Sequence, residues 1–215
     1  MSDHWQYVFD TLRRIYPDAR CELDYETPFQ LLIATIISAQ CTDQRVNIIT
    51  PVLFSRFRQP ADYLAVSQQE VEACIRSCGL YRNKAKSIIR CCQVLVDDFG
   101  GEVPRDLAAL QSLPGVGRKT AAVVASNAFG VPALAVDTHV LRVARRLGMT
   151  RSETPDKVEA DICALYPMES WIDLHHLLIW HGRRLCHARR PLCAQCPLHS
   201  VCRHLGAAAV KEGND

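Results

Sequence analysis

The sequence has no long apolar run and no sign of an export signal. Its longest apolar stretch, residues 31–37, is broken by Thr35 and is far shorter than the roughly 20 residues that a membrane-spanning helix needs. The opening residues, Met-Ser-Asp-His-Trp, lack the basic-then-apolar pattern of a signal peptide. We therefore expect no membrane role and a location in the cytoplasm.

An excess of charge of either sign is also lacking. The 215 residues include 25 Lys and Arg against 23 Asp and Glu, and this net charge of +2 does not by itself indicate a nucleic-acid partner. Positive charge does gather late in the chain, where four arginines fall within the eight residues 183–190. Such a cluster is typical either of a solvated edge or of a surface that meets an anionic partner.

Strand patterns and low-complexity linkers are scarce, and helical spacing dominates. Residues 5–15 carry apolar side chains on one helical face. Thr27 and Pro28 have the form of an N-cap and a first helical position, and they open a helix that is apolar almost all round. Asp43 can cap the next helix, which Pro51 should kink or interrupt. The pattern predicts an all-α fold.

Two helical patterns meet at a short turn, residues 113–120, with the sequence Leu-Pro-Gly-Val-Gly-Arg-Lys-Thr. Gly115 and Gly117 can adopt backbone angles closed to other residues and put no Cβ in the way of a ligand. The second helix begins at about Arg118, so its unpaired N–H groups and positive dipole end form an anion site beside the glycines. An ordinary helix connection can also contain a Pro-Gly turn, and the residues alone leave both interpretations open.

Lys119 and Asp137 are the best candidates for chemistry. Lys119 lies one residue inside the second helix, where the dipole and Arg118 disfavour a second positive charge and so favour a neutral, nucleophilic amine. A lysine at this position can instead hold a phosphate. Asp137 precedes another helical pattern, so it is the expected N-cap, and a carboxylate held there can also stabilise positive charge or accept a proton.

Only four of the eleven cysteines are clustered. The other seven are scattered among apolar residues and are expected to be small core side chains in a reducing compartment. The clustered four follow the spacing C-x6-C-x2-C-x5-C and are Cys186, Cys193, Cys196 and Cys202. Four soft ligands within seventeen residues indicate a metal site, for which zinc is the generic interpretation. The spacing differs from that of bacterial ferredoxins.

The turn at residues 113–121, followed by Val-Asp-Thr-His at 136–139, resembles the helix-hairpin-helix and catalytic aspartate of the endonuclease III family of DNA glycosylases. The resemblance extends from about Phe29 to Cys202. It implies a two-lobed, all-α helix-hairpin-helix DNA glycosylase fold. One lobe is a helical barrel over residues 21–131 that contains the hairpin at about 105–129, and the other joins residues 1–20 to 132–215.

The activity that this resemblance implies is that of a bifunctional DNA glycosylase and abasic-site lyase. It would remove oxidised pyrimidines from duplex DNA in base excision repair, act on a damaged base or an abasic site, and associate with the nucleoid as a monomer. In similar proteins the lysine matching Lys119 attacks the anomeric carbon of the damaged nucleotide, expels the base and forms a Schiff base, and β-elimination of the 3′ phosphate follows. Asp137 matches the catalytic aspartate.

The resemblance also implies a cofactor and a set of DNA contacts. The cysteine spacing is that of the family, where it holds a [4Fe-4S] cluster in a loop matching residues 186–202. The backbone of the turn would meet DNA at Gly115, Val116 and Gly117. Side chains that fill the gap left by a nucleotide outside the stack would be Gln40, Leu80 and His139. Phosphate contacts would come from Arg189 and Arg190.

Two other functions agree with part of the pattern. A relative of adenine-DNA glycosylase would share the hairpin, the aspartate and the cluster, but it would lack a lysine at the position of Lys119. A non-catalytic helix-hairpin-helix DNA-binding protein with a structural cluster would need Asp137 only as a helix cap. Gln40, Leu80 and His139 also have ordinary alternatives, as a polar helix end, a cap contact and a surface imidazole.

Overall fold

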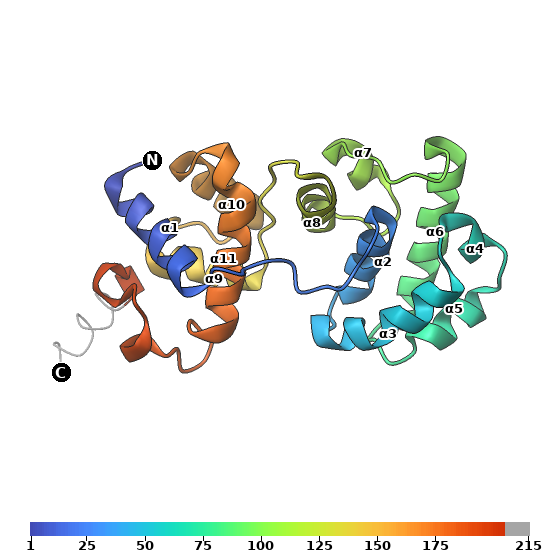
Figure 1. Cartoon of the computed structure of the whole chain (residues 1–215), viewed down its shortest axis with the longest axis horizontal. Coiled ribbons are helices and arrows are strands. Elements are labelled where there is room, and N and C mark those ends of the chain that lie inside the picture. The colour runs from blue at the N-terminus through green and yellow to red at the C-terminus, as the bar shows by residue number, and fades with distance from the viewer. Residues whose placement is uncertain (205–215) are drawn as a thin grey trace. The chain divides into compact units, whose positions relative to one another are not determined.

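A computed structural model of the chain describes residues 1–204 (Figure 1), and the end of the expected 132–215 segment lies outside the described residues. Every regular element in this range is helical, which confirms the predicted all-α class. Contacts divide the chain into two compact units. Unit 1 contains Met1–Arg20 and the residues from Leu134 onward, and unit 2 is Cys21–Ala133. None of the helices within residues 1–204 is long and apolar enough to cross a membrane.

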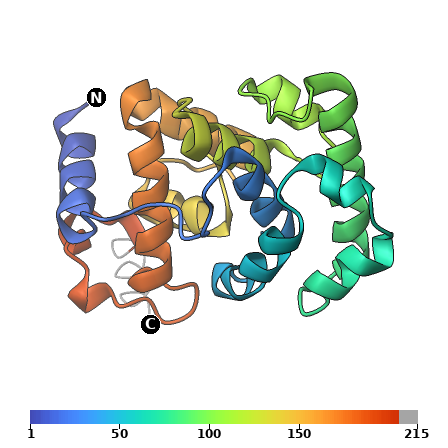
Figure 2. The ribbon, with the colours of Figure 1, turned by 45° about the vertical axis from the view of Figure 1, so that its right-hand side comes forward.

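Unit 2 is built around one buried helix, α2. Its helices are α2 (Pro28–Ser38), α3 (Asp43–Arg56), α4 (Pro60–Leu64), α5 (Gln68–Ile75), α6 (Tyr81–Phe99), α7 (Leu107–Ser112) and α8 (Arg118–Phe129). Helix α2 packs against α3, α6 and α8 (Figure 2). Seven consecutive buried residues, 31–37, would be unfavourable in water, but they are stable here because neighbouring helices cover α2 on several sides.

The helix starts of unit 2 agree in part with the sequence. The hydroxyl of Thr27 accepts from the N–H of Gln30 at 3.2 Å, as expected of the N-cap of α2. The prediction for α3 was wrong in detail, because Thr42 is the N-cap and Asp43 lies in the first turn. Helix α3 also continues through Pro51 without interruption. Packing of its apolar face in the core outweighs the one hydrogen bond that proline cannot donate.

Unit 1 combines both ends of the described chain. Its helices are α1 (Asp3–Ile15), α9 (Thr138–Leu147), α10 (Pro155–Leu165) and α11 (Trp171–Arg184), with 3-10 turns η1 (Met168–Ser170), η2 (Cys193–Gln195) and η3 (His199–Val201). Helix α11 packs against both α1 and α9, as the orange, blue and yellow ribbons of Figure 1 show. Val8, Phe9 and Leu12 enter the core from α1, so this helix is held by residues more than 120 positions later in the chain.

Candidate active site and metal centre

The predicted hairpin is present in unit 2, where α7 and α8 contact each other across the turn 113–117. Gly115 has φ of +81°, and a Cβ on it would lie 2.7 Å from the Cβ of Ser87, so glycine is required there for two reasons. Leu113 and Val116 are buried, and the N–H of Val116 donates to the carbonyl of Leu113 at 3.0 Å. The side chain and the N–H of Val116 are therefore both engaged within the unit.

Gly117 lies on the open side of the turn and is the N-cap of α8. Its φ of −85° is accessible to any residue, and a Cβ on it would meet no atom within 4 Å. As a glycine it supplies no side chain to accept from the first N–H groups of α8. Lys119, in that first turn, is exposed. The start of α8 is therefore an accessible positive helix end with a primary amine beside it.

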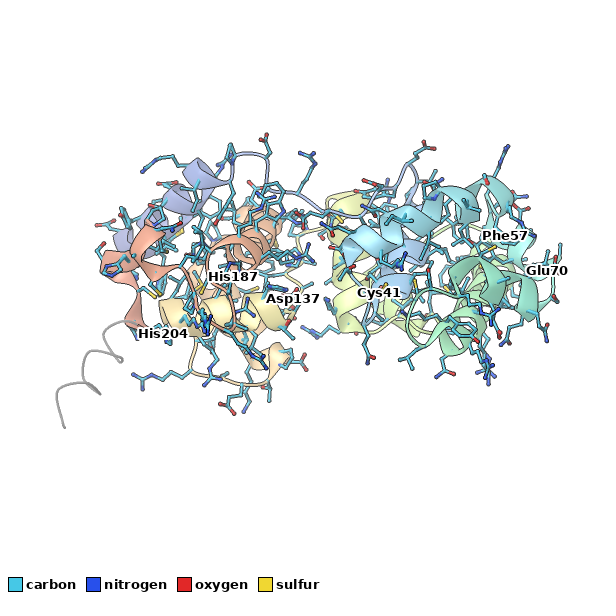
Figure 3. All side chains as sticks on the ribbon, turned by 90° about the horizontal axis from the view of Figure 1, so that it is seen from below. Cys41, Phe57, Glu70, Asp137, His187 and His204 are labelled. Carbon is cyan, nitrogen blue, oxygen red and sulfur yellow. The ribbon has the colours of Figure 1, made fainter. Side chains whose placement is uncertain are left out.

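Asp137 is the N-cap of α9 in unit 1, as predicted, and is labelled in Figure 3. Its Oδ1 accepts from the N–H groups of His139, at 2.8 Å, and Val140, at 2.7 Å. The preceding residues are buried, and His175 on α11 donates from Nδ1 to the carbonyl of Ala135 at 2.9 Å. The carboxylate is thus half-buried and held by two amides on a fixed backbone. Capping uses only one of its oxygens.

His139 follows Asp137 and packs against α11. Its Nδ1 accepts from Nη2 of Arg142 at 3.1 Å, and a Cβ added to Gly182 would lie 2.9 Å from the Cβ of His139. Burial lowers the pKa of His139, Asp137 opposes this shift, and Arg142 and Arg183 add to it. The imidazole is therefore neutral at neutral pH and half-buried rather than freely solvated.

Gln40 and Leu80 lie in two neighbouring turns of unit 2. Both have left-handed backbones, with φ of +55° for Gln40 and +58° for Leu80, which is uncommon for residues other than glycine. The turns are adjacent, because a Cβ on Gly79 would lie 3.7 Å from the carbonyl oxygen of Gln40. Both side chains are exposed, and 55% of the Leu80 surface is accessible. The structure thus brings together two of the three predicted gap-filling residues.

The four clustered cysteines line one pocket of about 390 Å³, counted to its open mouth, together with His181 and His199. Burial raises the pKa of Cys196, and the nearby thiols of Cys202, Cys186 and Cys193 raise it further. Within residues 1–204, no three His, Cys, Asp or Glu side chains are arranged to hold a single metal ion. Four thiols in one pocket are a ligand set that suits either a structural zinc ion or an iron-sulfur cluster.

The loop that joins the first two cysteines is held by Arg146 of α9, a residue that the sequence analysis missed. Its Nη1 donates to the carbonyl of His187 at 2.7 Å and to Sγ of Cys186 at 3.3 Å, and its Nη2 donates to the carbonyl of Ala188 at 3.2 Å. His187 is labelled in Figure 3. Arg189 and Arg190 follow and are exposed. No local pattern predicts this contact, because it joins residues about 40 positions apart.

Comparison with known proteins gives matches over nearly the whole chain. A sequence-family model described as "HhH-GPD superfamily base excision DNA repair protein" matches residues 33–168, and one described as "Iron-sulfur binding domain of endonuclease III" matches residues 186–202. Endonuclease III of Bacillus subtilis is 50% identical over 209 residues, covering 97% of this chain and 95% of that protein. Endonuclease III of Escherichia coli K12 is 43% identical over 197 residues, covering 92% and 93%.

The fold comparison agrees with these matches. A solved structure of a trapped endonuclease III–DNA covalent intermediate is similar to this chain, with a TM-score of 0.92 and 50% sequence identity. The match covers 97% of this chain and all of that one.

Proposed function

Because this chain belongs to the endonuclease III family, within the HhH-GPD superfamily of base excision DNA repair proteins, we propose that Lys119 and Asp137 carry its chemistry. Its activity is that of a bifunctional DNA glycosylase and abasic-site lyase in base excision repair. A covalent DNA intermediate in a protein 50% identical to this one supports an enzymatic nucleophile. Lys119 is an exposed primary amine on the first turn of α8, next to an open anion site.

In the first half of the reaction, the enzyme displaces the damaged base from the sugar. The amine of Lys119 forms a bond to the anomeric carbon of the damaged nucleotide while the bond from that carbon to the base breaks. The base leaves with the bonding electron pair and takes up a proton. Asp137 stabilises the positive charge that develops on the sugar and accepts the proton released by the amine. Two backbone amides donate to one oxygen of its carboxylate and fix its orientation for both tasks.

The second half cleaves the strand. Opening of the sugar ring leaves a protonated Schiff base between Lys119 and the anomeric carbon. Loss of a proton from the neighbouring carbon then expels the 3′ phosphate, which leaves with its electron pair, so the step is an elimination and consumes no water. Water releases the enzyme afterwards by hydrolysing the Schiff base.

DNA contacts follow from the same assignment. The open side of the turn at Gly115 and Gly117, with the positive end of α8, would receive a phosphate of the duplex. Gln40 and Leu80, exposed in adjacent turns, would fill the space that an extruded nucleotide leaves in the stack. The exposed Arg189 and Arg190 would contact phosphates. His139 would lie near the damaged nucleotide because it is close to Asp137 in the first turn of α9.

The protein carries a [4Fe-4S] cluster, as its iron-sulfur binding domain indicates. We propose that Cys186, Cys193, Cys196 and Cys202 are its four ligands, because they line one pocket. The cluster would serve as a scaffold for the loop of Arg189 and Arg190. We further propose that the enzyme acts as a monomer on duplex DNA containing an oxidised pyrimidine or an abasic site, in the cytoplasm and bound to the nucleoid.

Borohydride trapping tests the nucleophile. Reduction during turnover of an abasic duplex should join wild-type protein covalently to the DNA, because borohydride converts the Schiff base into a stable amine. Lys119→Gln should give no adduct and still bind the duplex, since many other phosphate contacts remain. Lys157→Gln, which changes an exposed lysine on α10, should trap as the wild type does. An adduct with Lys119→Gln, or its loss with Lys157→Gln, would refute the assignment.

A further inference from the structure

Two cysteines outside the cluster pocket lie in contact in the turns that carry the proposed gap-filling residues Gln40 and Leu80. The thiol of Cys41 donates to Sγ of Cys78, and the two sulfur atoms are 3.6 Å apart. Cys41 lies in the turn that ends α2, where its N–H donates to the carbonyl of Ser38. Cys78 lies in the equivalent turn after α5, where its N–H donates to the carbonyl of Ile75. Cys41 is labelled in Figure 3.

The same two turns carry Gln40 and Leu80. Gln40 precedes Cys41 directly, and only Gly79 separates Cys78 from Leu80. A disulfide bond is about 2.05 Å long, so closing the present gap of 3.6 Å would bring the sulfur atoms about 1.5 Å closer. Such a bond would fix one left-handed turn against the other. We propose that Cys41 and Cys78 form a reversible disulfide by exchange with a low-molecular-weight disulfide, and that this bond weakens binding of damaged DNA.

Accessibility assigns the two thiols different roles. Cys41 is half-buried and can meet a small reagent, whereas only 2% of the Cys78 surface is exposed. Cys41 therefore attacks one sulfur of the small disulfide, which expels one thiolate and leaves a mixed disulfide. Cys78 then attacks Cys41 and expels the second thiolate. Two electrons and two protons pass from the pair to the small disulfide, which becomes two thiols.

A buried lysine assists the second step. Lys84, in the first turn of α6, is only 5% exposed, and its Nζ makes no hydrogen bond within the described residues. An unpaired buried ammonium is unfavourable, and a thiolate nearby would compensate its charge. Burial raises the pKa of Cys78 to about 11, with the hydrogen bond and charge of Cys41 adding to the shift, while Lys84 and Arg45 oppose it. Cys78 is thus the slower, resolving thiol.

Oxidation should weaken DNA binding because the side chains of Gln40 and Leu80 must adjust their positions when they enter the stack of bases. A disulfide between their two turns would restrict that adjustment. This step rests on the proposed function of Gln40 and Leu80. In the reduced form a weak thiol hydrogen bond joins the two adjacent turns, whereas a disulfide would join them covalently. Thermodynamic linkage requires the reverse effect as well. If the disulfide lowers the DNA-binding constant by some factor, bound DNA lowers the equilibrium constant of disulfide formation by the same factor.

The site itself is tested without DNA. Cluster-loaded protein is incubated anaerobically with oxidised glutathione, alkylated with N-ethylmaleimide and mapped by mass spectrometry, with cluster absorbance followed as an integrity check. Wild-type protein should lose two alkylatable thiols and yield a peptide joining Cys41 to Cys78. Cys41→Ser should give neither this peptide nor a mixed disulfide, whereas Cys78→Ala should stop at a mixed disulfide on Cys41. Cys74→Ser, a half-buried control in α5, should still close the bond.

The consequence is tested with a duplex that contains a tetrahydrofuran abasic analogue. Oxidised protein should bind it about fivefold or more weakly at fixed salt, dithiothreitol should restore binding, and saturating duplex should reduce disulfide formation. Absence of the Cys41–Cys78 peptide, preferential pairing with another cysteine, or equal DNA affinity in both states would overturn the proposal. Failure of the Lys119 assignment would instead be seen in borohydride trapping, which involves neither cysteine.

Discussion

Gly115 and Gly117 lie two positions apart in one turn, yet the chain itself requires glycine only at the first. Gly115 has a left-handed backbone and faces Ser87, so any side chain would be strained and crowded. Gly117 has an ordinary φ and open space around its missing Cβ. The fold therefore does not explain Gly117, whereas the close approach of a DNA backbone would.

Replacing each glycine by serine should separate folding from binding. Gly117→Ser should keep or slightly raise stability, because serine is a preferred N-cap, and should weaken binding of duplex DNA. Gly115→Ser should lower the free energy of unfolding by about 1–2 kcal/mol from the left-handed backbone alone, with the contact at Ser87 adding to the loss. Urea denaturation and duplex titration measure the two effects. Normal DNA affinity in Gly117→Ser would show that the turn does not approach DNA there.

Asp137 combines a structural and a proposed chemical role, and two substitutions distinguish them. Asp137→Asn keeps an oxygen that can accept from His139 and Val140, so the protein should remain folded. It should lose base excision by roughly 100-fold to 10,000-fold, the usual contribution of a positioned acid–base group. Asp137→Ala should in addition lose about 0.5–2 kcal/mol of stability with the cap. Single-turnover excision and thermal denaturation check both, and unchanged excision in Asp137→Asn would contradict the role.

At the scale of elements, α9 links the proposed chemistry to the metal centre. Its first turn is capped by Asp137, and Arg142 and Arg146, four residues apart on one face, bind the loop that begins at Cys186. Arg142 donates from Nε to the carbonyl of Cys186 at 3.0 Å. One short helix thus positions both the carboxylate and the first of the proposed cysteine ligands.

Arg146 should control how firmly the cluster is held. Arg146→Lys keeps the charge but cannot reach three acceptors with a planar fork, so chelators should remove iron faster than from the wild type. Arg145→Lys is the matched control, because Arg145 is exposed and pairs with Glu153 at 3.1 Å. Decay of cluster absorbance under a chelator measures the difference. Equal decay in both variants would mean that Arg146 does not support the site.

Helix starts and the fold class could be predicted because they depend on residues close together in the sequence. Thr27 and Asp137 cap the helices that follow them, as their sequence positions predict. The contacts of Arg146, His175 and the pair Cys41–Cys78 could not be predicted, since each joins residues 37 or more positions apart. The error at Asp43 arose because Thr42 and Asp43 are both good N-caps, and sequence alone does not choose between them.

At the scale of the whole molecule, the role that we propose for the cluster is that of a scaffold. Purified protein should be yellow-brown and contain about four iron and four sulfide per chain. Cys193→Ser or Cys196→Ser should reduce soluble yield or DNA affinity more than the single-turnover rate of DNA-bound protein, because they loosen the loop and leave Lys119 intact. Metal analysis, DNA titration and single-turnover assays check this. Stoichiometric zinc without iron would contradict it.

Unit 1 is assembled from two stretches of chain that a ribosome makes at different times. A ribosome adds about 5–20 residues per second, so the 113 residues of Cys21–Ala133 place roughly 6–23 s between the two stretches. Unit 2 is continuous and can fold as soon as it emerges. Helix α1 is made before the other described helices, yet the core that receives Val8, Phe9 and Leu12 is built mainly from residues after Ala133, and α11, against which α1 packs, ends at Arg184. The apolar face of α1 is thus buried only after most of the chain has been synthesised.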